Sequence, residues 1–240
     1  MRLRYAKRGR LRFTSHRDFA RAFERALRRA EVPMAYSAGF TPHPKVSYVG
    51  AAPTGVASEA EYLEIGLDRA VDPEVLRSAL DAALPPGLDV VDAVVARGGS
   101  LPDRIDASEW LLELPGVPIE ELAAAVEKFL AAGEVPVERL TKKGRRLLDA
   151  RGAVVTLEVD ASASAADCDG ICAIMRIVVR HVTPAVRPDD VLTGLRSVSA
   201  LSPPVPPRAT RLAQGALMES GEIADPLAPD RDGDIIGART

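Results

Sequence analysis

Residues 15–30 read SHRDFARAFERALRRA, and this stretch predicts the helix around which the first part of the chain folds. Ser15 suits the N-cap, and Asp18 suits the third helical position in a short form of the capping box. Five apolar residues then recur at helical spacing and span about 100° of the helical wheel. They are Phe19, Phe23, Ala26, Leu27 and Ala30. We therefore expect one buried edge and one solvent-facing side.

Arginines occupy the solvent-facing side of this helix. Arg17, Arg21, Arg25 and Arg28 fall within about 80° of one another on the wheel, and Arg29 lies at their flank. A guanidinium group donates two parallel hydrogen bonds to a phosphate and is weakly hydrated. The helix is thus expected to present a row of positive charge to an anionic partner. The alternative is an ordinary solvated helix face in an arginine-rich protein.

The charge of the chain is divided unevenly. Through Lys45 the sequence holds 12 Lys and Arg against 3 Asp and Glu, whereas the remainder holds 19 against 31. A clustered positive field attracts polyanions whatever the net charge, which is −3 here. Further cations precede the helix, and two aromatic residues after it are available to stack on bases. The additional candidate nucleic-acid contacts are Arg4, Arg8, Arg10, Arg12, Tyr36 and Phe40.

Length and composition favour a globular protein of one or two domains. The chain has 240 residues, of which 47% are hydrophobic and 27% are charged. No run approaches the roughly 20 apolar residues that cross a bilayer, and the start lacks the apolar stretch of a secretion signal. Cys168 and Cys172 are the only cysteines, too few for a disulfide framework. We expect a cytoplasmic protein without a membrane partner.

The pattern of apolar residues predicts an α+β fold of two ferredoxin-like (βαββαβ) sandwiches in tandem. The expected domains are residues 1–97 and 108–218, joined by a linker at 98–107 and followed by an acidic, disordered tail at 219–240. In the first domain the expected strands are 3–14, 34–39 with 45–49, 61–67 and 88–95, and the second helix is 73–83. In the second domain the expected strands are 109–114, 137–141, 154–159, 171–182 and 208–218, the helices 119–132 and 187–198, and the mobile loop 160–170.

Four polar residues form a candidate catalytic cluster: His16, Asp18, His43 and Lys45. If they met at one end of the sheet, one imidazole could take a 2′-hydroxyl proton while Lys45 stabilised the charged phosphorane. The same residues could bind phosphate without reacting, because a helix N-terminus is an anion site. They could also be structural, with His16 at the start of the helix and His43 in a rigid turn between two prolines.

The sequence predicts neither a metal site nor a cofactor. Cys168 and Cys172 have CxxxC spacing, but no third cysteine or nearby histidine completes a site. The acidic run 230–234 lacks the terminal bidentate Glu and the flanking helices of a calcium loop. No P-loop, GxGxxG or GxSxG motif is present.

Several stretches of the first 90 residues together resemble the radical SAM-linked protein family. They are KRGRLRFTSHRD at 7–18, RALRRA at 25–30, YSAGFTPHPK at 36–45, and Pro33, Gly55, Ser58, Glu61, Tyr62, Leu84, Pro85 and Gly87. The family pattern usually has Leu where this chain has Arg17. Its members occur fused to, or encoded beside, cobalamin-binding radical SAM proteins. In actinobacteria they resemble stand-alone proteins near ribonuclease E/G and ribosomal protein genes. The resemblance implies a genomic association and not a reaction.

Three hypotheses follow. The leading one is an RNA-binding accessory or adaptor protein that supports RNA modification or processing, and this role is not enzymatic. The second is a metal-independent endoribonuclease that uses His16 and His43, comparable in fold to CRISPR repeat-processing ribonucleases. The third is a protein–protein adaptor whose basic head docks a radical SAM or ribonuclease E/G partner.

Overall fold

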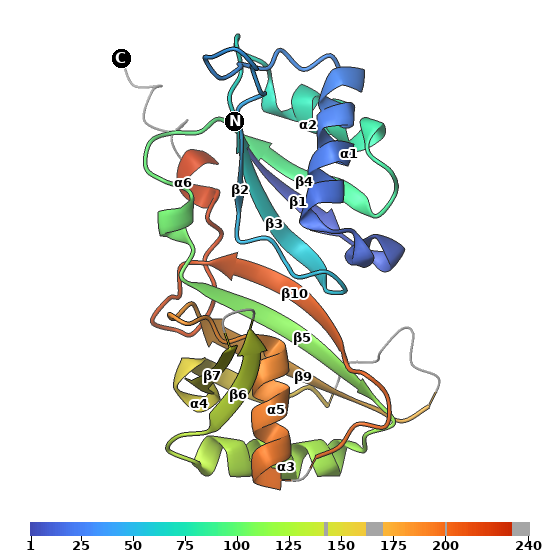
Figure 1. The fold of residues 1–240 in the computed structure, drawn as a ribbon, viewed down its shortest axis with the longest axis vertical. Helices are drawn as coiled ribbons and strands as arrows, with labels where there is room; N and C mark the ends of the chain where they lie inside the picture. Colours follow the sequence, from blue (N-terminus) through green and yellow to red (C-terminus); the bar gives the residue numbers. More distant parts are fainter. Residues whose placement is uncertain (142–143, 162–169, 200, 232–240) are drawn as a thin grey trace. The chain divides into compact units, whose positions relative to one another are not determined.

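The structure is a computed structural model that describes residues 1–141, 144–161, 170–199 and 201–231. The chain divides into two compact units. The first comprises Met1–Ile105 together with residues 225–231, and the second is Asp106–Ala224. Both combine helices with antiparallel strands, so the protein is α+β (Figure 1). No helix among the described residues is both long enough and apolar enough to cross a membrane.

The first unit is a four-stranded antiparallel sheet with two long helices. Its main elements are β1 (Arg2–Lys7), α1 (His16–Arg29), β2 (Val46–Val49), β3 (Ala57–Ile65), α2 (Pro73–Ala83) and β4 (Leu88–Val94). The spatial order of the strands is β4-β1-β3-β2, and each neighbouring pair is antiparallel. The first unit also has three short helical elements: η1 (Gly9–Phe13) between β1 and α1, and η2 (Pro102–Arg104) and α6 (Ala228–Arg231) after β4.

Helices α1 and α2 cover one face of this sheet. Leu3 and Tyr5 alternate along β1 toward the helices, because successive side chains of a strand point to opposite faces. Phe19 of α1 stacks on Tyr5 with ring centroids 4.3 Å apart, and Phe23 lies 5.8 Å from Phe19. The apolar stripe predicted for α1 is thus the stripe that packs on the sheet.

The opposite face of the sheet is covered by two segments of the first unit, the one that follows β4 and the one that begins at Asp225. Tyr62 of β3 packs there against Leu101 and Leu227, both fully buried. Arg2 projects to the same face, and its Nη1 lies 2.9 Å from both carboxylate oxygens of Asp230. The prediction of a disordered tail from 219 is therefore wrong for residues 225–231, which belong to this unit. The predicted linker at 98–107 likewise contains a buried anchor, Leu101.

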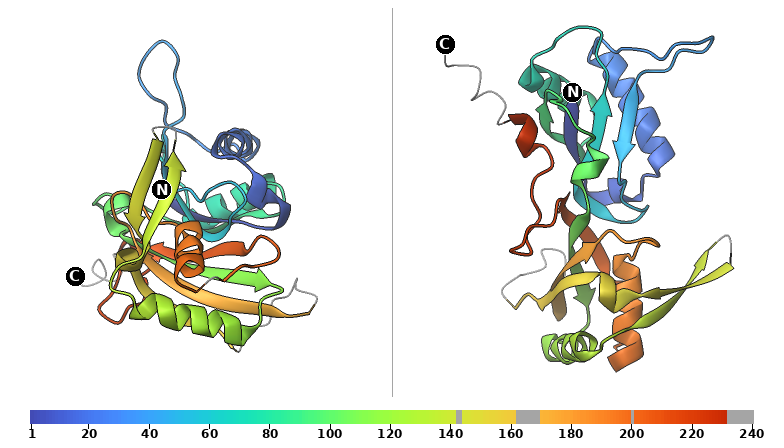
Figure 2. Two further views of the ribbon diagram at one scale, coloured as in Figure 1. Left: turned by 60° about the horizontal axis from the view of Figure 1, so that its bottom comes forward. Right: turned by 90° about the vertical axis from the view of Figure 1, so that its left-hand side faces the viewer.

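The second unit repeats the strand order of the first. Its elements are β5 (Ala107–Pro115), α3 (Ile119–Ala131), β6 (Pro136–Thr141), β7 (Gly144–Asp149), α4 (Ala150–Ala153), β8 (Val154–Val159), β9 (Cys172–Arg180), α5 (Pro188–Ser199) and β10 (Arg208–Gly215). The sheet order is β10-β5-β9-β8, all antiparallel, and β6 pairs with β7 in a separate hairpin. Figure 2 shows this hairpin extending outward from α4 and α5.

Some predicted elements differ from the structure. The first strand ends at Lys7 and not at Thr14, because a 3-10 turn begins at Gly9, whose φ is +52°. Phe13, predicted within that strand, is consequently 59% exposed. Residues 34–39 form only isolated bridges and no strand. Strand β7 and helix α4 were not predicted, whereas the helix at 73–83 and the strand at 154–159 are confirmed. Much of the predicted loop at 160–170, including Cys168, lies outside the described residues.

Candidate nucleic-acid interface

Helix α1 begins as its sequence predicts. The Ser15 hydroxyl oxygen accepts a hydrogen bond from the Asp18 backbone N–H at 3.2 Å, and the same hydroxyl donates to the Asp18 carboxylate at 2.6 Å. These bonds satisfy a backbone donor that the first helical turn would leave free. Burial of Phe23 and Leu27 then sets the rotation of the helix on the sheet.

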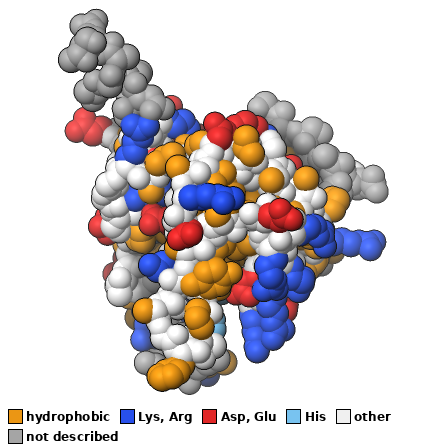
Figure 3. Space-filling view, turned by 90° about the horizontal axis from the view of Figure 1, so that it is seen from above, with side chains coloured by type: hydrophobic (Ala, Val, Ile, Leu, Met, Phe, Trp, Pro, Cys, Tyr) orange, Lys and Arg blue, Asp and Glu red, His pale blue; other side chains and the backbone are white. Residues whose placement is uncertain are grey.

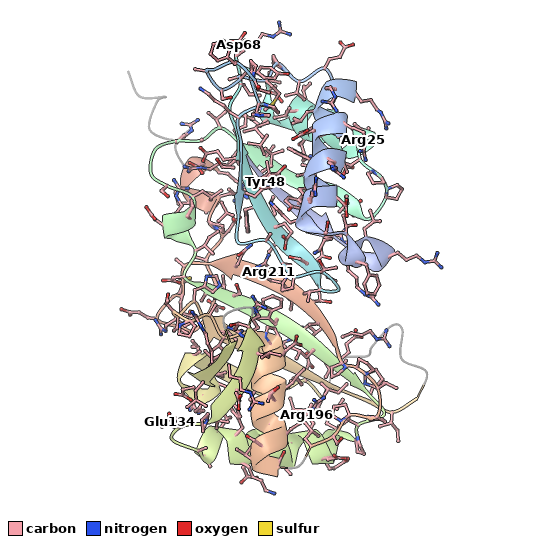
Figure 4. All side chains as sticks on the ribbon, in the orientation of Figure 1. Arg25, Tyr48, Asp68, Glu134, Arg196 and Arg211 are labelled. Atoms are coloured by element: carbon pink, nitrogen blue, oxygen red, sulfur yellow. The ribbon has the colours of Figure 1, made fainter. Side chains whose placement is uncertain are left out.

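That rotation exposes Arg17, Arg21, Arg25 and Arg28, which we call the ridge. No carboxylate lies within ion-pair distance of these four guanidinium groups in the described part of the chain. The neighbouring Arg29 differs, because its Nη1 donates to the carbonyl oxygen of Ala83 at 3.2 Å. Figure 4 marks Arg25 on α1, and Figure 3 shows Lys and Arg side chains gathered in a cluster on the surface. The ridge is thus a row of exposed arginines without ion-pair partners among the described residues, and Glu24 is the acidic residue one helical turn before Arg28.

Arg4, one of the additional candidate contacts, does not extend the ridge. Arg4 alternates with Leu3 and Tyr5, so it leaves β1 on the face opposite α1, and its Nε donates to the carbonyl oxygen of Glu59 at 2.8 Å.

Arg8 differs from the ridge arginines because it forms ion pairs with two carboxylates. Its Nε donates to Glu59 at 2.7 Å, and its Nη1 donates to Asp89 at 2.8 Å. The hydrogen bonds to Glu59 raise the pKa of the guanidinium, although partial burial opposes them. Arg10 and Arg12 lie on η1, and the Arg12 guanidinium sits 4.7 Å from the Phe13 ring centroid. Arg10 is exposed and Arg12 is half-buried.

The predicted catalytic cluster does not assemble in one place. His16 packs edge-on against Tyr48 of β2, with ring centroids 4.8 Å apart, and Asp18 is engaged in the helix cap. His43 lines a groove beside the far end of α1, together with Glu24 and Arg28. About 18 Å of helical rise separates positions 16 and 28, at 1.5 Å per residue. Neither His16 nor Lys45 lines that groove.

We call this depression the α1 groove. It has a volume of about 220 Å³ and lies between the last turns of α1 and the segment 36–44, which we call the 36–44 loop. The loop is held by a hydrogen bond from the Ser37 N–H to the His43 carbonyl oxygen at 2.8 Å, and by one from the His43 N–H to Ser37 Oγ at 3.0 Å. Figure 2 shows the loop projecting from the helices and sheet of the first unit.

Two aromatic residues stand on the 36–44 loop. Tyr36 lines the α1 groove and is 54% exposed, and Phe40 is fully exposed at the tip, where Gly39 has a φ of +128°. Tyr48 lies in β2 (Figure 4), where its ring packs against His16 and Phe19. Burial of its phenol, with a smaller contribution from the negative charge of Glu24, raises its pKa to about 12.

Glu24 and Met34 line the α1 groove but were not among the predicted site residues. Glu24 could have been placed beside Arg28 from the sequence, because residues four positions apart are neighbours on a helix. Met34 could not have been placed in the groove, because its position there depends on the path of the chain after α1. No group of three or more His, Cys, Asp or Glu side chains that could hold a metal ion occurs in the described ranges.

Comparison with known proteins gives a family and distant structural likenesses. A family model described as an uncharacterized protein conserved in bacteria, DUF2344, matches residues 1–188. No curated protein matches the chain. A solved structure titled as a crystal structure of a Cbf5-Nop10-Gar1 complex aligns with a TM-score of 0.44 and 10% sequence identity. The alignment covers 89% of this chain and 48% of that one, so this chain spans about half its length.

Proposed function

We propose that this chain, which belongs to the bacterial family DUF2344, binds RNA as an accessory or adaptor protein in RNA modification or processing. The observation that carries the proposal is the ridge. Four exposed arginines lie on one side of one helix, and none has a carboxylate partner among the described residues. Arginines spaced along a helix suit a phosphate backbone, because each guanidinium can bind one phosphate through paired hydrogen bonds.

The separation of His16 from the α1 groove favours this role over the endoribonuclease hypothesis. General acid–base catalysis requires both groups within hydrogen-bond reach of one reacting phosphodiester. His16 instead packs on Tyr48, at the first turn of α1, while His43 stands beside its last turns.

The resemblance to radical SAM-linked proteins supports a partner for this role. We propose that the protein acts in the cytoplasm and presents its RNA to a radical SAM enzyme or to ribonuclease E/G. A pull-down that survives nuclease treatment would identify a direct protein contact, whereas loss of capture after nuclease would identify RNA as the bridge.

The strand orders β4-β1-β3-β2 and β10-β5-β9-β8 support the finer interpretation that both units are ferredoxin-like. In each unit the first strand lies between the third and fourth core strands, with two helical crossovers. In the second unit the β6–β7 hairpin and α4 would then be an insertion in the first crossover.

A salt titration of RNA binding tests the proposal. The apparent affinity should fall as salt rises, with a logarithmic slope near −0.7 for each phosphate contacted on a single strand. The double variant Arg21→Gln/Arg25→Gln should bind more weakly at low salt and show a slope smaller by about one to two. Absence of RNA binding by the unmodified chain at low salt, or binding without a salt slope, would refute the proposal.

A charge-matched control separates the ridge from net charge. The variant Arg69→Gln/Arg196→Gln removes two exposed arginines that lie outside α1. It should retain the affinity and slope of the unmodified chain. Equal losses in the two double variants would mean that binding depends on overall charge and not on the ridge.

A further inference from the structure

We infer that the α1 groove and the 36–44 loop bind an unpaired nucleotide of the RNA, whose neighbouring phosphates lie on the ridge. The inference rests on the proposed function and specifies its substrate class, which is single-stranded RNA or a loop and not a continuous duplex.

The groove and the ridge form one surface. Arg28 belongs to both, because it is the last ridge residue and also lines the groove. A ligand that enters the groove therefore meets Arg28 and Glu24 on the side of α1 and Tyr36 on the side of the loop. A molecule that carries an anionic group beside a flat aromatic group fits this pairing, and each nucleotide of an RNA strand has this form.

The size of the groove favours one base. Its volume of about 220 Å³ is below the roughly 300–1,000 Å³ of pockets that hold drug-sized ligands or cofactors. Polar atoms are available at its wall for the edge of a base, since Glu24 can accept a hydrogen bond and His43 can donate or accept one. Met34 supplies a buried apolar floor.

The aromatic residues of the 36–44 loop point to unpaired bases. Phe40 contributes no packing to the fold, because its side chain is fully exposed at the loop tip. The loop that carries it is nevertheless fixed to the fold, since the Lys45 N–H donates to the Ala35 carbonyl at 2.9 Å and the Gly66 N–H donates to the Lys45 carbonyl at 2.9 Å. Aromatic side chains held out in this way stack on splayed bases, which a continuous duplex keeps within its own stack.

Direct binding measurements with two RNAs of equal length, one single-stranded and one fully paired, test the inference. The unmodified chain should bind the single strand more tightly at low salt. Tyr36→Ala and Phe40→Ala should each weaken single-strand binding by about 5-fold or more, the loss expected when one base stack of at least about 1 kcal/mol is removed. Both variants should leave duplex binding and the salt slope unchanged. A fluorescent base analogue in the single strand should be quenched by the unmodified chain and less so by the variants.

Two further variants separate this inference from the proposed function. Phe13→Ala removes an exposed aromatic residue outside the groove, and it should bind both RNAs as the unmodified chain does. Arg21→Gln/Arg25→Gln should weaken binding to both RNAs. If the chain binds both RNAs equally and Tyr36→Ala and Phe40→Ala change nothing, the nucleotide site is refuted while RNA binding on the ridge stands. If no RNA binds, the proposed function itself fails.

Discussion

Arg2 and Arg25 are the same residue type, separated by 23 positions, and the fold uses them in opposite ways. Arg2 is 2% exposed and pairs with Asp230 and Glu64, whereas Arg25 is exposed and has no carboxylate partner. The difference follows from what faces each guanidinium. A buried charge must be paired and hydrogen-bonded, while an exposed one on a helix is stabilised by water and remains available.

Removal of the Asp230 carboxylate should destabilise the first unit strongly. Asp230 accepts hydrogen bonds from Arg2 at 2.9 Å, from Arg104 at 2.8 Å and from the Arg97 N–H at 2.8 Å. Asp230→Ala leaves the buried Arg2 with only the partly exposed Glu64 as a carboxylate partner, so the free energy of unfolding should fall by about 3 kcal/mol. Denaturant unfolding measures the loss.

The pair between Arg8 and Glu59 provides the control for this measurement. Both side chains are partly exposed, so Glu59→Ala should cost about 1 kcal/mol or less. Equal costs for the two substitutions would show that the Asp230 pair is not buried in solution.

Asp230 should also make the first unit sensitive to acid. Burial would raise the pKa of its carboxyl, but the hydrogen bonds from Arg2, the Arg97 N–H and Arg104 outweigh burial, and the pKa lies below its ordinary value of 3.8. A lowered folded-state pKa contributes stability above pH 3.8, and this contribution is lost as the pH falls through the folded-state pKa. Unfolding measured from pH 5 downward should show this loss in the unmodified chain. Asp230→Asn should be less stable at pH 5 and should lack that part of the acid slope.

At the scale of elements, the residues that hold α1 on the sheet are different from the residues of the ridge. Its cap and its apolar stripe hold it on the sheet, and the ridge takes no part in either. The helix can therefore carry a row of exposed arginines without losing its place in the fold. Its amphipathic pattern was readable from sequence because the period of 3.6 residues relates side chains only 3 or 4 positions apart.

Substitution of the N-cap residue should lower stability without changing RNA binding. Ser15→Ala removes the oxygen that accepts from the Asp18 N–H, and the free energy of unfolding should fall by about 1 kcal/mol. RNA binding per folded molecule should be unchanged, since the ridge remains exposed. A loss of affinity that exceeds the loss of folded protein would mean that the cap also positions Arg17, the ridge residue in the first turn of α1.

For the whole molecule, the chain leaves the first unit at Ile105 and re-enters it at Asp225. The returning segment supplies Leu227 and Asp230 to the sheet face opposite α1. The acidic character of this segment, which composition alone associates with disorder, instead provides the carboxylate for a buried arginine.

Deletion of residues 225–240 should therefore unfold or strongly destabilise the first unit. Loss of the fully buried Leu227 alone should cost about 2–5 kcal/mol, and loss of Asp230 also removes the buried carboxylate that pairs with Arg2. Deletion of residues 232–240 alone keeps every contact described above and serves as the control. The melting temperatures of the two truncated chains, compared with that of the full chain, decide the outcome. Similar melting temperatures for all three chains would contradict the role of the returning segment.

Local pattern was enough to predict α1, its cap, its apolar stripe and the arginines opposite, because each depends on residues within a few turns of one helix. The alternation of β1 and the helix at 73–83 were readable for the same reason. Three features required the tertiary structure: the pairing of Arg2 with Asp230, the distance between His16 and His43, and the groove between α1 and the 36–44 loop. Each depends on groups that are far apart in the sequence or joined by irregular segments. Periodicity and composition describe local sequence only, so they do not predict which of these groups come together.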